Sequence, residues 1–213
     1  MTDDLLDALA RDLAPRPRRR VGPRLAVALA AGAFVSLVGV MLLLGPRSDF
    51  PAALGSAMFW TKLFYVLALA AAALGSVERL ARPGGEVRRR VGWLAAPVAA
   101  MALAALVQWI LAPTAMHRTL LMGDSASVCP WLIATAAAPI FLALAWAMRG
   151  LAPTRLRTAG AMAGLAAGAA GAAVYALHCR EAGGAFVLIW YSLGVLAPAA
   201  LGWLLGPSLL RWR

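Results

Sequence analysis

The sequence predicts an all-α, polytopic membrane protein with six transmembrane helices and both termini in the cytoplasm. Of its 213 residues, 62% are hydrophobic and only 14% are charged, and the mean hydropathy is +0.78. Soluble domains average roughly 25% charged residues and about half apolar ones. This composition excludes a soluble enzyme, a disordered chain and a secreted disulfide-rich domain, because so much apolar surface requires a bilayer as part of the solvent.

Six apolar stretches are each close to the ~20 residues that a helix needs to cross the hydrocarbon core. Breaks such as Gly45-Pro46-Arg47 separate them. The chain lacks the alternation of polar and apolar positions that a membrane barrel requires. Helices, whose backbone hydrogen bonds close internally, are therefore the predicted spans. They cover approximately residues 25–44, 54–74, 92–111, 131–148, 159–177 and 185–205.

The positions of the twenty basic residues predict how these spans are oriented. Sixteen fall before span one, between spans two and three, after span four or at the C-terminus. They are Arg11, Arg16, Arg18, Arg19, Arg20, Arg24, Arg79, Arg82, Arg88, Arg89, Arg90, Arg149, Arg155, Arg157, Arg211 and Arg213. On the other side lie Arg47, Arg118 and Arg180. The positive-inside rule then places both termini in the cytoplasm, and we interpret the charge of +11 as an orientation signal and not as a nucleic-acid-binding surface.

Residues 1–24 form the predicted cytoplasmic tail, and residues 25–213 form the six-helix transmembrane bundle. The tail predicts a short helix with acids in its first turn and leucines along one face. Its predicted contact residues are Asp3, Asp4, Leu5, Leu6, Leu9 and Leu13. A helix of about 12 residues is marginal alone in water, and anionic lipid would repel its acidic face. A groove on a partner protein is the favoured target, and the chain's own basic loop at residues 88–90 is the alternative.

Cys129 and Cys179 are the only cysteines, and both are predicted at the outer face. His117 shares an outer loop with Cys129, and His178 and Glu181 lie next to Cys179. In a periplasm, where disulfides persist, the pair could form a structural disulfide or a redox-responsive thiol pair. It could also form a soft-metal site with one or both histidines, since thiolate and imidazole suit zinc, cadmium or copper. Two unrelated free thiols are the fourth interpretation.

Lys62 is the only lysine and lies well inside span two. A charged group at mid-membrane costs about 3 kcal/mol. The favoured interpretation is that its stem extends outward so that the ammonium reaches the interface. The alternative is that Lys62 pairs with an outer acid such as Glu181 or Asp124 and holds the bundle in one state.

Span five carries Gly160, Gly164 and Gly168 at four-residue intervals. Such a stripe of small residues allows a neighbouring helix to approach closely. We expect this contact within the monomer rather than in a dimer, and the oligomeric state stays open.

Two rival functions fit these observations less well. A small transporter or channel would place polar groups at mid-membrane on several helices, where this chain offers little besides Lys62 and Gln108. A membrane thiol-disulfide oxidoreductase would usually need a Cys-x-x-Cys motif or a second cysteine pair. Neither rival explains the acidic, leucine-striped tail.

Several motifs resemble those of the NrsF-type membrane anti-sigma factors over essentially the whole chain. The likeness is carried by the opening residues 2–10, by Cys129 at the start of span four, and by two outer segments. These segments are Tyr175-Ala176-Leu177-His178-Cys179-Arg180-Glu181 and Trp190-Tyr191-Ser192-Leu193-Gly194.

The resemblance implies a bacterial inner-membrane protein that is not an enzyme and that sequesters an extracytoplasmic-function (ECF) sigma factor. It implies that oxidants or heavy metals cause release, and that Cys129 and Cys179 are the sensor. Residues 3–13 would bind the sigma factor. No resident cofactor is expected, and a heavy-metal ion would act only as a signal.

Overall fold

The computed structural model describes residues 21–82, 91–149, 151 and 153–211. Within these residues every regular element is helical. The predicted sigma-binding residues Asp3, Asp4, Leu5, Leu6, Leu9 and Leu13 lie outside the described residues, as does the basic loop at residues 88–90. The all-α fold class predicted from the sequence is confirmed for the bundle.

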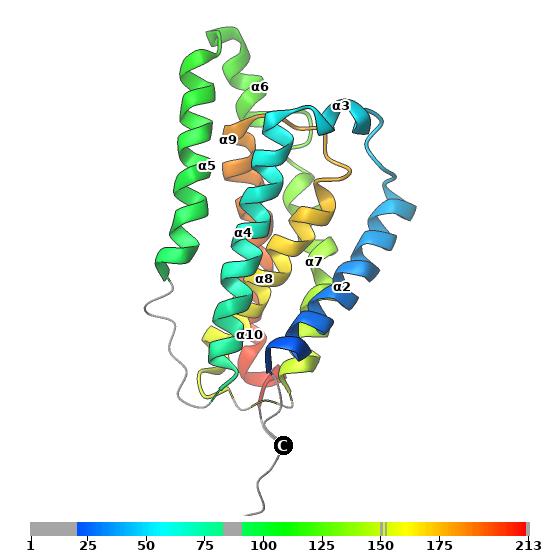
Figure 1. Cartoon of the computed structure of the whole chain (residues 1–213), viewed down its shortest axis with the longest axis vertical. Helices are drawn as coiled ribbons and strands as arrows, with labels where there is room; N and C mark the ends of the chain where they lie inside the picture. Colours follow the sequence, from blue (N-terminus) through cyan, green and yellow to red (C-terminus); the bar gives the residue numbers. More distant parts are fainter. Residues whose placement is uncertain (1–20, 83–90, 150, 152, 212–213) are drawn as a thin grey trace, which may run out of the picture.

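Six helical segments in the described part are long and apolar enough to cross a membrane, which confirms the six predicted spans. Five are single helices: α2 (Val21–Leu43), α4 (Ala57–Leu80), α5 (Val91–Leu111), α7 (Cys129–Met148) and α8 (Leu156–Tyr175). The sixth joins α9 (Gly184–Phe186), a π-helix (Val187–Tyr191) and α10 (Ser192–Leu209). The connections contain α3 (Phe50–Leu54), a 3₁₀ turn (Thr114–Met116) and α6 (His117–Met122) (Figure 1).

Several helix boundaries differ by a few residues from the sequence-based ones, and two of them matter for the fold. Span two, predicted to end near residue 74, continues to Leu80 as α4. An ion pair of 3.0 Å joins Glu78 in its last turn to Arg82 just beyond it. Span five, predicted to end near residue 177, ends at Tyr175. There the N–H groups of His178 and Cys179 both donate to the Tyr175 carbonyl. Cys179 therefore lies in the connection after α8 and not in its last turn.

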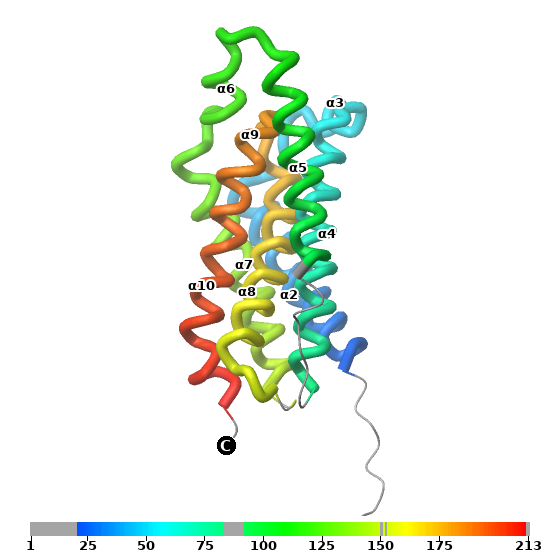
Figure 2. Tube along the Cα trace, turned by 90° about the vertical axis from the view of Figure 1, so that its left-hand side faces the viewer, coloured from blue at the N-terminus to red at the C-terminus, as the bar shows by residue number. Residues whose placement is uncertain are grey.

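Helix α8 is the centre of the bundle. It packs against α10, α7, α4 and α2, and both views show it surrounded by these helices (Figures 1 and 2). Its many alanines and glycines explain this position, since small side chains let several neighbours approach at once. In contrast, α5 packs mainly against α4 and the α9 segment and stands at the edge of the bundle.

The glycine stripe of α8 lies against α10 of the same chain. We call this the glycine contact, formed by Gly160, Gly164 and Gly168 on α8 with Val195, Pro198, Gly202 and Gly206 on α10. A methyl group added at Gly160 or Gly164 would collide with the α10 main chain. The two backbones therefore touch directly, and only glycine fits.

The two ends of the bundle differ in composition. At the basic end, α2 begins and α10 ends, and the arginines Arg24, Arg82, Arg149, Arg155 and Arg157 lie in or beside the helix termini there. At the cysteine end lie α3, α6, the start of α7 and the connection 176–183. Between the ends, large apolar side chains such as Phe34, Phe64 and Leu103 are exposed, as expected for a lipid-facing surface. The side of the membrane that each end faces stays a prediction.

Candidate functional site

The structure brings the two cysteines together at the cysteine end. Cys129 is the first residue of α7, and its N–H donates to the Ser125 carbonyl at 2.8 Å. Cys179 follows α8, and both residues are buried with free thiols. The two thiols are neighbours, and each affects the protonation of the other. Residues 50 positions apart in the sequence therefore form one site.

The surroundings of the Cys179 sulfur favour its thiolate form. Hydrogen bonding with the Cys129 thiol, helped by the charge of Lys62 and the Tyr191 hydroxyl, lowers the pKa of Cys179 to about 6, although burial opposes this shift. The main chain of Glu181 also contributes to lowering this pKa. A low thiol pKa is the property that makes a cysteine nucleophilic at neutral pH.

Lys62 is buried at the centre of this site, with 1% of its surface exposed. Its Nζ donates to the main-chain carbonyls of Cys179 and Glu181, each at 3.0 Å. The Tyr191 ring lies 5.3 Å from the same atom. The predicted outward extension of Lys62 is therefore wrong, because α4 turns this residue inward, where two carbonyls compensate for the lost hydration.

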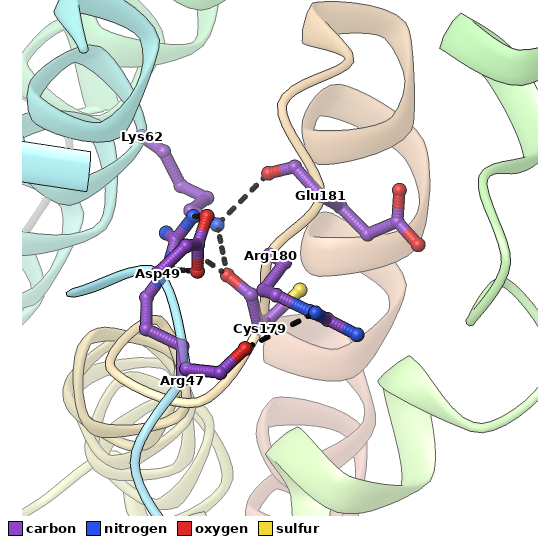
Figure 3. A network of polar contacts seen from close by, with 7 residues as sticks. Arg47, Asp49, Lys62, Cys179, Arg180 and Glu181 are labelled. Atoms are coloured by element: carbon purple, nitrogen blue, oxygen red, sulfur yellow. Dashed lines mark hydrogen bonds and ion pairs between the residues drawn. The ribbon is translucent and has the colours of Figure 1, made fainter. Parts of the chain in front are cut away.

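The second interpretation of Lys62, a pair with an outer acid, needs correction as well. Figure 3 shows that Lys62 contacts the Glu181 carbonyl, whereas the Glu181 carboxylate points away from it. What Lys62 holds is the main chain of the 179–181 segment. The sequence correctly identified Lys62 as a structural contact. Its partners could not be predicted, because every residue has a main-chain carbonyl.

The Glu181 carboxylate holds the connection between α6 and α7. Its Oε1 accepts the Asp124 N–H at 2.8 Å, the Ser125 N–H at 3.2 Å and the Ser125 hydroxyl at 3.0 Å. Gly123 precedes this turn with a positive φ of 50°, and a side chain there would collide with the carboxylate. Because the Ser125 carbonyl in turn accepts the Cys129 N–H, Glu181 links the segment of Cys179 to that of Cys129.

Arg47 ties the connection between α2 and α3 to the same segment. It forms two hydrogen bonds of 2.8 Å to the Asp49 carboxylate, and its Nη1 donates to the Cys179 carbonyl at 3.4 Å (Figure 3). Its main-chain N–H donates to the Leu177 carbonyl at 3.1 Å. The hydrogen bonds from Arg47 lower the pKa of Asp49 to about 2, so this pair is ionised across the physiological range.

The two histidines are held elsewhere. The His178 Nδ1 hydrogen-bonds with the Gly45 carbonyl at 2.9 Å. His117 stacks on Trp109 with ring centroids 4.2 Å apart and bonds to its carbonyl. Over the described ranges, no group of three or more His, Cys, Asp or Glu residues could hold a metal ion. A metal at Cys129, Cys179 and a histidine stays a prediction that would require rearrangement.

Sequence reasoning missed three contributors to this site. The sequence marks Arg47 only as an outer charge, and Tyr191 only as part of the resemblance motif. Gln108 was regarded as an isolated polar group, yet its Nε2 donates to the Ala182 carbonyl at 3.1 Å and its Oε1 accepts the Gly184 N–H. A polar amide near the end of an apolar span was the one signal that could have indicated a contact with a loop.

Comparisons with known proteins identify the family. A family model described as NrsF, negative regulator of sigma F, matches residues 9–212. The chain is 42% identical over 211 residues to the probable anti-sigma-F factor NrsF of Azospira oryzae, and 41% identical over 218 residues to the anti-sigma-F factor NrsF of Caulobacter vibrioides, with 99% of each chain covered in both cases. No solved structure matches significantly. These full-length matches confirm the resemblance, and the chain belongs to the NrsF family of negative regulators of sigma F.

Proposed function

We propose that this protein is an anti-sigma factor of a bacterial inner membrane. The observation that carries the proposal is the similarity over 99% of the chain to two proteins that are both named anti-sigma-F factor. The protein would act by binding and not by catalysis, keeping its sigma factor from RNA polymerase. Its described residues fit an integral membrane protein, with six helices suited to crossing a bilayer.

The partner in this proposal is an ECF sigma factor, bound by the leucine face of the tail. Helix α2 begins at the basic end, so the tail joins the bundle there. The arginines beside the tail support, by the positive-inside rule, a cytoplasmic location of the basic end in this proposal. An acidic helix with a leucine stripe suits a groove that has apolar walls and basic residues at its rim.

The cysteine pair supplies the signal in this proposal. Reaction of Cys129 and Cys179 with an oxidant or a heavy metal would change the packing at the cysteine end, and α8 runs from there to the basic end. Such a change releases a partner only if the two packings bind it with different affinities. A coupling of about 1–3 kcal/mol corresponds to a 5- to 150-fold change in affinity.

The binding proposal is tested by affinity purification of the full-length protein from detergent-solubilised membranes. Copurifying sigma factors are identified by mass spectrometry. We expect the triple variant Leu5→Asp, Leu6→Asp, Leu9→Asp to lose the sigma factor, because each change places a charge in the proposed apolar contact. The control Arg11→Asp alters a residue on the opposite face of the predicted helix and should retain the sigma factor. Equal recovery with the triple variant would contradict the tail assignment.

The sensing proposal is tested in cells with a reporter gene that depends on the copurified sigma factor. We expect hydrogen peroxide or cadmium to induce the reporter with the wild-type protein. Replacement of both cysteines by serine should abolish induction, while the protein stays in the membrane fraction and still retains its sigma factor. An unchanged response in the double variant would remove the sensor role and leave the anti-sigma role intact.

A further inference from the structure

The two cysteines differ in their access to solvent. A cavity of about 440 Å³ opens at the cysteine end, and Cys179 lines it together with Arg47, His178 and Glu181. Cys129 has no exposed surface and is absent from the wall of this cavity. A small molecule that enters the cavity therefore meets Cys179 first.

The two cysteines also differ in the groups around them. Tyr191 is fully buried, and among the described residues its hydroxyl has no hydrogen-bond partner. Its neighbour is the Cys179 sulfur. The hydroxyl is placed by the π-helix that ends at Tyr191, an irregular turn of a kind that is frequent at functional sites. A buried O–H without an acceptor gains one when the sulfur becomes negatively charged.

Lys62 adds a positive charge on the same side. Its Nζ is fixed at 3.0 Å from the Cys179 and Glu181 carbonyls, so the ammonium is held beside the residue that carries the sulfur. Hydrogen-bond donors that already point at a developing negative charge stabilise it without further reorganisation. The low pKa of Cys179 agrees with this arrangement.

We propose that Cys179 is the nucleophile that reacts with a small hydroperoxide, and that Cys129 is the resolving thiol that completes a disulfide. Lys62 and Tyr191 are positioning residues that hold the Cys179 thiolate. For its role in signalling the inference rests on the proposed function, which left the order of reaction at the two cysteines open.

The chemistry balances with hydrogen peroxide as the oxidant. The Cys179 thiolate attacks one peroxide oxygen, the O–O bond breaks, and the departing hydroxide takes up the proton that the thiol had released, which gives water and a sulfenic acid. The Cys129 sulfur then attacks the Cys179 sulfur and displaces hydroxide, which leaves as a second water with the Cys129 proton. Each cysteine loses one electron, and the peroxide is reduced to two waters.

The test uses the full-length protein purified in detergent, with hydrogen peroxide as the probe and dimedone as the trap for sulfenic acid. In Cys129→Ser, we expect the dimedone adduct to accumulate on Cys179, because the resolving thiol is missing. In Cys179→Ser, the adduct on Cys129 should form at least about tenfold more slowly. Equal rates, or faster reaction at Cys129, would overturn the inference.

The positioning roles are tested by Tyr191→Phe and Lys62→Met in the Cys129→Ser background. We expect slower adduct formation and a midpoint for alkylation by iodoacetamide that moves to higher pH, since each change removes a group that stabilises the thiolate. Tyr65→Phe is the matched control, because its hydroxyl bonds to Ser192 at 2.8 Å and not to a cysteine. An unchanged pH profile in a folded Tyr191→Phe protein would exclude the role of that hydroxyl.

These results are independent of sigma-factor binding. If Cys129 reacts first while the wild-type protein still copurifies with its sigma factor, only this inference fails. If Cys179 reacts first but no sigma factor copurifies, the chemistry stands and the proposed function fails.

Discussion

The cysteine end and the glycine contact are stabilised in different ways. At the cysteine end, connections far apart in the sequence are joined by polar bonds, many of them from side chains to main-chain atoms, such as those of Lys62 and Glu181. At the glycine contact, the α8 and α10 backbones touch, and polar side chains take no part.

This difference indicates that the cysteine end can rearrange after a reaction at a cysteine. It also indicates that the glycine contact can transmit such a rearrangement. A hydrogen-bonded network has alternative partners and can rearrange when one sulfur changes its charge or its bonding. Two backbones in direct contact have no side chains that could repack between them, and well-packed interiors compress little. We therefore expect α8 and α10 to move together when the cysteine end rearranges.

The largest effect is expected for Gly164→Leu at the glycine contact. The new side chain would collide with the Pro198 main chain, and overpacking of this kind should cost about 3 kcal/mol or more. The control Gly39→Leu lies on α2, where an added Cβ has nothing within 4 Å. The midpoint of thermal unfolding in detergent should fall for the first variant only. Equal midpoints would mean that the backbones are not in contact.

Lys62→Met should have the next largest effect, located at the cysteine end. The Glu181 carbonyl loses its Lys62 donor, and the Cys179 carbonyl keeps only the longer bond from Arg47. Leaving a buried acceptor unpaired costs about 1–3 kcal/mol. Amide hydrogen exchange of residues 176–183 should accelerate, whereas exchange in the half of α8 nearest the basic end should stay slow. The neighbouring control Thr61→Val removes an exposed hydroxyl that bonds only within α4. A uniform acceleration along α8 would show that the two regions are not separable.

Glu181→Gln should weaken only the hydrogen bonds that join the Glu181 side chain to Asp124 and Ser125. The neutral amide accepts the Asp124 and Ser125 N–H bonds less strongly than a carboxylate does, at a cost of about 1 kcal/mol. The amides of Asp124 and Ser125 should then exchange about fivefold faster, as that free energy implies. Asp124→Asn, which alters an exposed carboxylate beside the same turn, should leave the exchange of Ser125 unchanged.

The smallest effect is the pH dependence of the pair of Arg47 and Asp49. The pKa of Asp49 is lowered to about 2, so its stabilising contribution is complete above the ordinary pKa of an aspartate and is lost as the pH falls through about 2. The difference in unfolding midpoint between wild type and Asp49→Asn should therefore be constant near neutral pH and vanish near pH 2. A difference that grows in acid would contradict the assignment.

Much of the fold could be predicted because it depends on length and composition. Six apolar stretches required six spanning helices, and the glycines at positions 160, 164 and 168 indicated a close contact before its partner was known. The helix ends were less predictable. The N–H groups of His178 and Cys179 turn back to one carbonyl, and α4 continues through Glu78 and Arg79 despite their charge. Hydropathy cannot resolve either event.

The sequence by itself determined that the chain is a six-helix membrane protein, that its cysteines belong to one end, and which family it resembles. Hydrophobic length, charge asymmetry and residue motifs are one-dimensional properties, so they can be read without coordinates. Only the tertiary structure decided that Lys62 points inward, that Glu181 holds the start of α7, and that Tyr191 faces Cys179. These contacts depend on helix rotation and on main-chain partners, which residue identities do not specify.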